Sequence, residues 1–183
     1  MYATFQTRAE AVSAEVHRFS GRAQAVHFLE ALLASEQVAD RPGARAVWAD
    51  RGLVTPEERE ALCRRVPGLT FEVTRGRAAE AAVGVTQFDY AIANTGTLAA
   101  AAQAVEERLA ATLPQIHVAL VDPASLVPDL PALLALLGPS RTPFLSLVTG
   151  PSRTADIERV LTIGVHGPRR LVIAFVQGLG ARS

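Results

Sequence analysis

The segment 150–158 carries the residue types of an anion-binding site. It reads Gly150-Pro151-Ser152-Arg153-Thr154-Ala155-Asp156-Ile157-Glu158 and follows a predicted strand over 144–148. Ser152 and Thr154 are residue types that begin helices, so a helix as far as residue 163 is expected. Unpaired amides at a helix N-terminus attract anions, and Arg153 can hold a carboxylate or phosphate through two hydrogen bonds. The segment therefore predicts a small-anion site at Gly150, Ser152, Arg153 and Thr154.

A capped helix without a ligand is the alternative interpretation of this segment. Asp156 and Glu158 fall in the predicted first turn, where their charges stabilise the helix dipole and repel an anion. If the protein is an enzyme, these carboxylates and Asp89 are candidates for acid–base chemistry, with Arg153 anchoring the anion.

A second polar loop follows a predicted strand over 88–93. Asn94, Thr95 and Thr97 offer neutral hydrogen-bonding groups around Gly96, where a glycine lets the backbone approach a ligand. The loop suits a phosphate or a carboxylate. The alternative is a tight turn that needs a positive φ at Gly96.

A third loop, 164–168, holds a histidine between two glycines. Histidine is easily poised near neutral pH, so His166 is a further catalytic candidate and Gly167 a further site residue. A lone loop histidine is, however, more often only a hydrogen-bonding residue. His117, in a predicted strand over 116–121, is expected to be a core or rim histidine. Because the histidines at 17, 27, 117 and 166 lack short ligand spacings, no metal site is predicted.

The overall composition excludes several kinds of chemistry. The chain has 183 residues with 18 basic and 18 acidic side chains, and its zero net charge argues against a nucleic-acid binder. All basic residues are arginine, so Schiff-base chemistry and a P-loop lysine are unavailable. The single cysteine, Cys63, cannot hold an iron–sulfur cluster or complete a structural zinc site.

Membrane and export signals are not evident in the sequence. The longest apolar runs are far shorter than the roughly 20 residues that cross a bilayer. The first residues lack the basic-then-apolar layout of a signal peptide, which predicts a cytoplasmic protein.

Strands and helices alternate from residue 41 onward. Strands are predicted over 44–49, 69–74, 88–93, 116–121, 144–148 and 171–176, with helices over 55–65 and 131–137 and a weak one over 75–83. The strands are continuous apolar runs, which favours an α/β fold with a mainly parallel sheet covered on both faces. Open sheets of this class bind ligands beyond the carboxyl ends of their strands, so the three loops are expected to meet there.

Residues 1–40 are predicted to form a helical arm of two helices, and 41–183 the sheet core of the same single domain. Val26, Leu29 and Leu33 form an apolar stripe on the second helix, whose partner is either the sheet core or a second copy of the chain.

Residues 98–112 are ambiguous. Their alanines favour a helix, whereas Thr95-Gly96 after a strand suits a hairpin. Glu106, Glu107 and Arg108 are expected to form a solvated helix face.

The order and spacing of these loops resemble those of the LUD-domain family. The resemblance rests on 84–98, on 108–119 and 127–130, and above all on 149–158 and 164–168. It implies a three-layer sandwich similar to the sugar-phosphate isomerase and CoA-transferase fold, favours a hairpin after Thr97, and adds Arg108 to the site. One departure is Asn94, because the family commonly has an acidic residue before Thr-Gly-Thr. If that acid is catalytic in relatives, it has no counterpart here, whereas ligand binding does not depend on it.

The resemblance implies a role in the oxidation of L-lactate to pyruvate beside companion proteins that carry iron–sulfur clusters. Since one cysteine cannot carry the electrons, this chain is expected to be a cluster-free component that binds a small anion or a phosphate-bearing cofactor of unknown identity. Two alternatives remain open. One is an enzyme of the CoA-transferase or sugar-phosphate isomerase kind. The other is a sensor or interaction module in which copies of the chain associate through the stripe at Leu29 and Leu33 to form a homo-oligomer.

Overall fold

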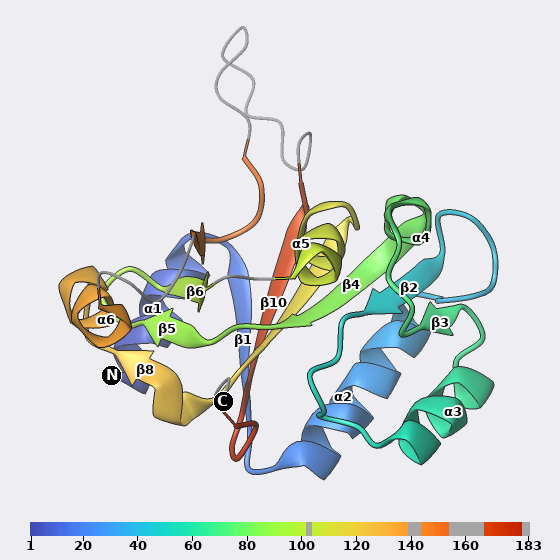
Figure 1. The fold of residues 1–183 in the computed structure, drawn as a ribbon, viewed down its shortest axis with the longest axis horizontal. Coiled ribbons are helices and arrows are strands. Elements are labelled where there is room, and N and C mark those ends of the chain that lie inside the picture. The colour runs from blue at the N-terminus through green and yellow to red at the C-terminus, as the bar shows by residue number, and fades with distance from the viewer. Residues whose placement is uncertain (102–103, 139–143, 154–166, 181–183) are drawn as a thin grey trace, which may run out of the picture.

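Two β-sheets organise the chain (Figure 1). The computed structural model describes residues 1–101, 104–138, 144–153 and 167–180. The larger sheet has six strands in the order β1-β10-β7-β4-β2-β3, all parallel to their neighbours. Its strands are β1 (Ala14–Phe19), β2 (Arg45–Trp48), β3 (Leu69–Thr70), β4 (Ala81–Gln87), β7 (Ile116–Val121) and β10 (Arg170–Val176).

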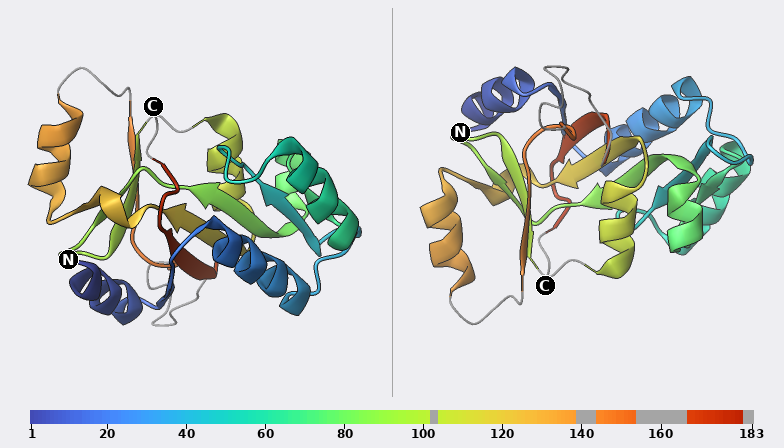
Figure 2. Two further views of the ribbon diagram at one scale, coloured as in Figure 1. Left: turned by 90° about the horizontal axis from the view of Figure 1, so that it is seen from below. Right: turned by 90° about the horizontal axis from the view of Figure 1, so that it is seen from above.

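Helices cover both faces of the six-stranded sheet, which is the predicted three-layer α/β arrangement (Figure 2). One face packs against α2 (Arg22–Ser35) and α3 (Pro56–Arg65). The other packs against α1 (Tyr2–Ala11), α4 (Arg75–Ala79) and α5 (Val105–Thr112). Because both faces are covered, all six residues of β7 are buried, as its continuous apolar run predicts.

A second sheet was not predicted. It has four strands in the order β8-β5-β6-β9, with β5 (Tyr90–Ile92), β6 (Thr97–Ala101), β8 (Leu126–Val127) and β9 (Leu145–Val148). One side of it shares a core with the six-stranded sheet and α1, through Phe5, Leu98 and Phe175 among others. The short helix η1 (Pro123–Ser125) precedes β8, and α6 (Leu130–Leu137) covers the other side.

The helix α3 begins where its sequence signals lie. The Thr55 hydroxyl accepts a hydrogen bond from the Glu58 amide at 3.3 Å, and the Glu58 carboxylate accepts one from the Thr55 amide at 2.8 Å. With Pro56 in the first turn, this is the predicted capping box.

The prediction of a purely helical arm over 1–40 is wrong. The first helix ends at Ala11, and β1 follows as the outermost strand of the six-stranded sheet, paired along its length with β10. Residues 14–17, Ala-Glu-Val-His, alternate small or apolar with polar side chains as a partly exposed edge strand does, and Arg18 and Phe19 reverse the order. The stripe on α2 packs inward, since Leu29 and Leu33 are each 1% exposed in the sheet core. These two residues therefore offer no surface to a second copy or a partner.

The ambiguous stretch 98–112 contains both predicted structures in succession. Strand β6 pairs antiparallel with β5 as a hairpin, and α5 begins at Val105. The hairpin confirms what the resemblance implied. The helix that the alanines favour forms as well, but it begins only at Val105.

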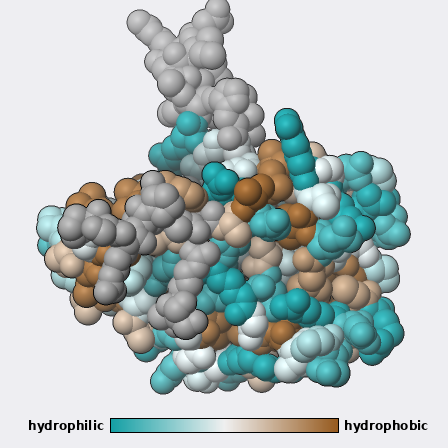
Figure 3. Space-filling view, viewed as in Figure 1, coloured by the Kyte–Doolittle hydropathy of each residue, from teal (hydrophilic) through white to brown (hydrophobic). Residues whose placement is uncertain are grey.

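The surface is uneven in polarity. Hydrophobic side chains gather on the side that carries α6 and the four-stranded sheet, and hydrophilic ones around α3 and α4 (Figure 3). Leu134, Leu136 and Leu147 are among the exposed large apolar residues. No helix within the described residues is long and apolar enough to cross a membrane.

Candidate functional site

Two of the three predicted loops meet around one pocket of about 250 Å³. The loop after β9 contributes Gly150 and Ser152, and the loop before β10 contributes Gly167. His117 and Thr112 supply further polar atoms. The sequence motifs around 150 and 167 are therefore neighbours in space, which is the main result for the predicted anion site.

The pocket lies at the amino ends of the parallel strands, and the prediction that the loops meet at the carboxyl ends is wrong. Gly167 and Pro168 precede β10, and His117 is the second residue of β7. Backbone hydrogen bonds hold the two strand starts together, since the Arg169 amide donates to the Gln115 carbonyl at 2.8 Å. Ser13, which directly precedes β1, lies at the same edge, where it contacts Arg153. The cause is the four-stranded sheet, because β9 runs antiparallel to β6 and delivers residue 149 to this edge.

Close backbone contacts explain the glycines of this site. Gly150 has a φ of +75°, and a Cβ there would lie 2.7 Å from the Val12 carbonyl oxygen. A Cβ on Gly167 would lie 3.2 Å from the Cβ of Ser152, whose amide donates to the Pro168 carbonyl at 2.8 Å. Gly167 thus lets its loop pack against the Ser152 side chain, and Gly150 lets the other loop pack against Val12 at the end of α1.

Hydroxyl groups tie the β5–β6 hairpin to the pocket. The Oγ1 atoms of Thr97 and Thr149 are 2.8 Å apart, and Thr97 is 5% exposed. Thr149 lines the pocket. Of the second predicted loop, Thr97 is therefore the residue that reaches the site, through its neighbour.

Asn94, Thr95 and Gly96 form the hairpin turn and do not line the pocket. Asn94 and Thr95 are exposed, and the Asn94 amide donates to the Pro128 carbonyl at 3.1 Å. Gly96 has a φ of +67° and packs so closely on α1 that a Cβ would overlap the Ala9 backbone. This is the geometry of the tight turn that was the alternative interpretation.

His117 forms a buried polar wall of the pocket. The residue is 1% exposed, and its Nε2 atom is 2.8 Å from the Thr86 hydroxyl. Burial lowers its pKa from 6.5 to about 4, so the imidazole is neutral at physiological pH. The expected core histidine is thus also a pocket residue, a role for which its apolar strand sequence carries no signal.

Two arginines of the predicted site lie near the pocket with different partners. Arg153 is exposed, and its Nη2 atom donates to the Ser13 hydroxyl at 3.1 Å. Among the described residues Arg153 forms no ion pair, so its guanidinium charge can attract an anion. Arg108 instead stacks on Phe144, with its Cζ atom 5.1 Å from the ring centroid.

Asp89 lies apart from the pocket, at the carboxyl end of β4, in a buried ion network. Its Oδ1 atom accepts from Arg51 Nη1 at 2.5 Å, and its Oδ2 atom accepts from the Ala101 amide at 2.8 Å. Arg51 also pairs with Glu107, whose carboxylate accepts from the Ala104 amide at 2.8 Å. Burial alone would lower the pKa of Arg51, but the carboxylates of Glu107 and Asp89 outweigh burial and raise this pKa above its ordinary value. Asp89 is thus engaged as a structural ion partner.

Glu107 corrects a further prediction, because it is 5% exposed rather than part of a solvated face. Its position three residues after Ala104, at the start of α5, is the signal that identifies it as a helix-start carboxylate. Thr154, Asp156, Glu158 and His166 lie outside the described residues and stay predictions.

Comparison with known proteins places the whole arrangement in a family. The family model of the LUD domain matches residues 2–176. A Lactate utilization protein C of Anoxybacillus flavithermus is 36% identical over 104 residues, which are 54% of this chain and 47% of that protein. One of Exiguobacterium sp. is 34% identical over 114 residues, which are 59% of this chain and 50% of that protein. The chain thus spans about half the length of these curated relatives.

A solved structure shares the fold along nearly the whole chain. It is that of a DUF162 family protein from Deinococcus radiodurans, with a TM-score of 0.62 and 20% sequence identity. The match covers 96% of this chain and 95% of that one. At this identity the likeness concerns the fold alone.

Proposed function

Because this chain belongs to the LUD domain family, we propose that it is a component of an L-lactate utilisation system in which lactate is oxidised to pyruvate. The observation that carries this proposal is the match, at 34% to 36% identity, to proteins named Lactate utilization protein C. The matched proteins are about twice as long as their matched parts, so the role of this chain has to be tested on the chain itself.

In this proposal the chain is the component without redox chemistry. Cys63 is its single cysteine, lies partly buried on α3, and has a pKa raised by burial. A cluster of the usual kind needs four thiolate ligands, so the electrons pass through partner proteins that carry iron–sulfur clusters. The chain contributes ligand binding or assembly.

The pocket beside His117 is the proposed ligand site. Its volume of about 250 Å³ lies below the roughly 300 Å³ at which pockets for drug-sized ligands begin, and suits a molecule of a few heavy atoms. Hydroxyls of Thr149 and Ser152 and the neutral imidazole of His117 can hydrogen-bond a hydroxyl or carbonyl group. Arg153, next to Ser152, adds the positive charge that favours a small carboxylate or a single phosphate group.

A genetic experiment tests the pathway role. Deletion of the gene should abolish growth on L-lactate as the sole carbon source, and expression of the wild-type chain should restore it. The tagged chain should also co-purify iron–sulfur proteins. Normal growth of the deletion strain on lactate would overturn the proposal.

A binding experiment tests the site separately. Isothermal calorimetry with L-lactate, pyruvate, inorganic phosphate and coenzyme A should give binding to at least one of them, weakened about tenfold or more by Arg153→Ala, because a charge-assisted hydrogen bond contributes about 1.5 kcal/mol or more. Arg64→Ala is the matched control, since Arg64 is an exposed arginine whose ion pair with Glu60 measures 3.8 Å. Equal binding by both variants would exclude Arg153 from the site.

An enzyme of the CoA-transferase or sugar-phosphate isomerase kind is the less favoured function. Among its four predicted acid–base residues, Asp89 is the one within the described residues, and it is committed to Arg51 and the Ala101 amide. Binding of coenzyme A or a sugar phosphate in preference to small carboxylates would favour this alternative.

A further inference from the structure

Strand β1 presents an unpaired edge. It pairs with β10, and no second strand lies against it in the described part of the chain. The Phe19 carbonyl accepts from the Gln177 amide at 3.1 Å, so the backbone groups of Phe19 point toward β10. Because successive residues of a strand point their amides and carbonyls in opposite directions, those of Ala14, Val16 and Arg18 point outward.

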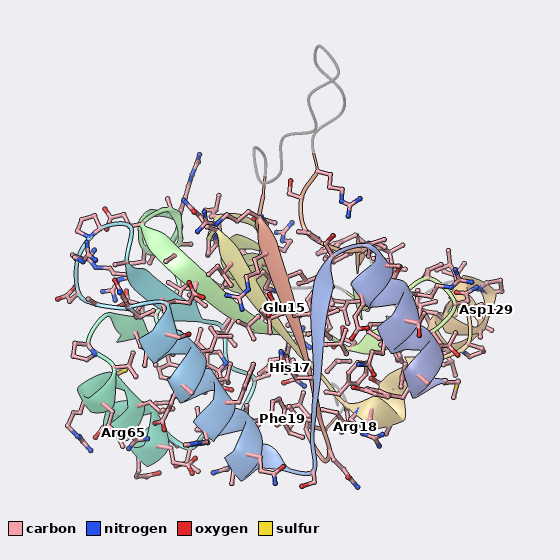
Figure 4. The ribbon with its side chains drawn as sticks, turned by 180° about the vertical axis from the view of Figure 1, so that it is seen from behind. Glu15, His17, Arg18, Phe19, Arg65 and Asp129 are labelled. Carbon is pink, nitrogen blue, oxygen red and sulfur yellow. The ribbon has the colours of Figure 1, made fainter. Side chains whose placement is uncertain are left out.

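The features that protect edge strands from pairing are few on β1. Natural edges are commonly blunted by proline, by a bulge, by a covering element or by charged side chains, and of these β1 carries the charged Glu15 and Arg18. β1 contains no proline, and its six-residue register with β10 is continuous. In Figure 4 the strand lies between α2 and α1 and faces the viewer. Within the described residues the edge is therefore available to another strand.

The side chains of β1 differ on its two faces. Glu15 and His17 line a groove of about 330 Å³ beside α2, where the small residues Ala31 and Ser35 leave space (Figure 4). On the opposite face Val16 packs near α1, and Arg18 lies over the Tyr2 ring at 4.9 Å. The strand thus carries an acidic and an imidazole group on one face, two residues apart.

We propose that this edge binds a second copy of the chain, with the two β1 strands antiparallel about a two-fold axis at Val16. A two-fold axis normal to the sheet places the same face of both copies on the same side of the joined sheet. Side chains of odd-numbered β1 residues therefore lie opposite odd-numbered ones of the other copy, and even-numbered ones opposite even-numbered ones. With Val16 opposite Val16, Glu15 of each copy lies opposite His17 of the other, and Arg18 opposite Ala14. The two six-stranded sheets join into one.

Charge complementarity selects both the partner and the register. An imidazole donates a hydrogen bond to a carboxylate whether it is neutral or protonated. Glu15 already accepts from Arg170 at 2.5 and 2.9 Å, and a carboxylate has about four acceptor sites, so a further donor can be bound. Centring the pairing on His17 would instead place His17 opposite His17 and Glu15 opposite Phe19, which loses both cross-strand pairs.

Light scattering coupled to size exclusion tests the dimer. The wild-type chain should have twice the monomer mass at high concentration. Val16→Pro should give a monomer, because proline removes the outward amide at the axis. Val16→Ile is its matched control and should remain dimeric. His17→Glu, which sets glutamate opposite glutamate, should also weaken the dimer, and His17→Arg should preserve it. A wild-type chain that stays monomeric at all concentrations would overturn the proposal.

Disulfide trapping tests the register. In a Cys63→Ser background, Val16→Cys should form a covalent dimer on mild oxidation, because directly paired Cα atoms lie about 5.5 Å apart, within disulfide range. Arg18→Cys should not, since the two introduced cysteines would be about 13 Å apart along the strands. A dimer that is trapped by Arg18→Cys and not by Val16→Cys would refute this interface, as would a dimer indifferent to Val16→Pro.

Discussion

At the scale of single residues, His117 makes stability depend on pH. Its pKa of about 4 in the folded chain lies below the ordinary value of 6.5, because the buried imidazole is desolvated. Between these values the unfolded chain binds a proton that the folded chain does not. The folded state is thus fully favoured above pH 6.5 and loses about 3 kcal/mol as the pH falls to 4.

Urea unfolding at a series of pH values measures this loss. His117→Gln is the informative variant, since its amide can still hydrogen-bond the Thr86 hydroxyl but does not titrate. Between pH 6.5 and 4 it should lose less stability than the wild-type chain, by about 3 kcal/mol. Parallel curves for the two chains would show that His117 does not titrate as its burial implies.

Gly96 is a second residue whose replacement has a defined cost. Gly96→Ala would place a Cβ against the Ala9 backbone and hold alanine at a φ of +67°. We expect a loss above about 2 kcal/mol in the free energy of unfolding, from strain and the displacement of α1. Gly43→Ala separates the two causes, because Gly43 has a φ of +78° with nothing within 4 Å and should cost only about 1 kcal/mol. Similar losses for both variants would mean that the contact with α1 adds nothing.

At the scale of elements, one ion network fastens three segments together. Arg51 follows β2, Asp89 follows β4, and Glu107 lies on α5, and all three side chains are at most 15% exposed. Arg51→Met would remove a cation that Asp89 and Glu107 share in a buried position, at a cost of about 3 kcal/mol or more.

Chemical denaturation at pH 7 measures this loss for Arg51→Met. Arg64→Met, which removes an exposed pair, should change stability by less than about 1 kcal/mol. If Arg51→Met is as stable as Arg64→Met, the network does not hold these elements.

Elements with strong local signals were predictable from the sequence. Strand β7 matches the predicted range 116–121, and α3 begins at its capping box. Strand β1 was missed because its alternation is short and lies between two helices with many alanines. Strand β4 was missed altogether, because Ala81 and Ala82 continue the composition of the helix predicted over 75–83. The four-stranded sheet was missed because it depends on pairings between residues far apart in the sequence.

The candidate site was predictable in its residues more than in its place. Motifs identify Gly150, Ser152 and Gly167, and the pocket brings them together. Their position at the amino edge follows from the antiparallel course of β9, for which local sequence has no signal. The roles of His117 and Thr149 depend equally on that pairing.

At the scale of the whole molecule, the two sheets share one core. Phe5 and Ala9 of α1 pack with Leu98 of the four-stranded sheet and with Ile173 and Phe175 of the six-stranded one. The rings of Phe5 and Phe175 meet edge to face, with centroids 5.1 Å apart. Neither sheet can open without exposing apolar surface of the other, so we expect them to unfold together.

Cooperative unfolding can be tested with one probe in each sheet. Trp48, 1% exposed in β2, reports on the six-stranded sheet by fluorescence, and amide exchange of β6 reports on the four-stranded one. Both should give the same free energy of unfolding, and Phe5→Ala should lower both equally, by about 3 kcal/mol or more. Phe71→Ala, at a half-buried ring beside Trp48 and outside the shared core, is the control and should cost less. The contrary result would be exchange of β6 through a local opening whose free energy is well below that of global unfolding, with Phe5→Ala lowering only the free energy of this opening. The four-stranded sheet would then be a separate folding unit, and the pocket between the sheets would open without global unfolding.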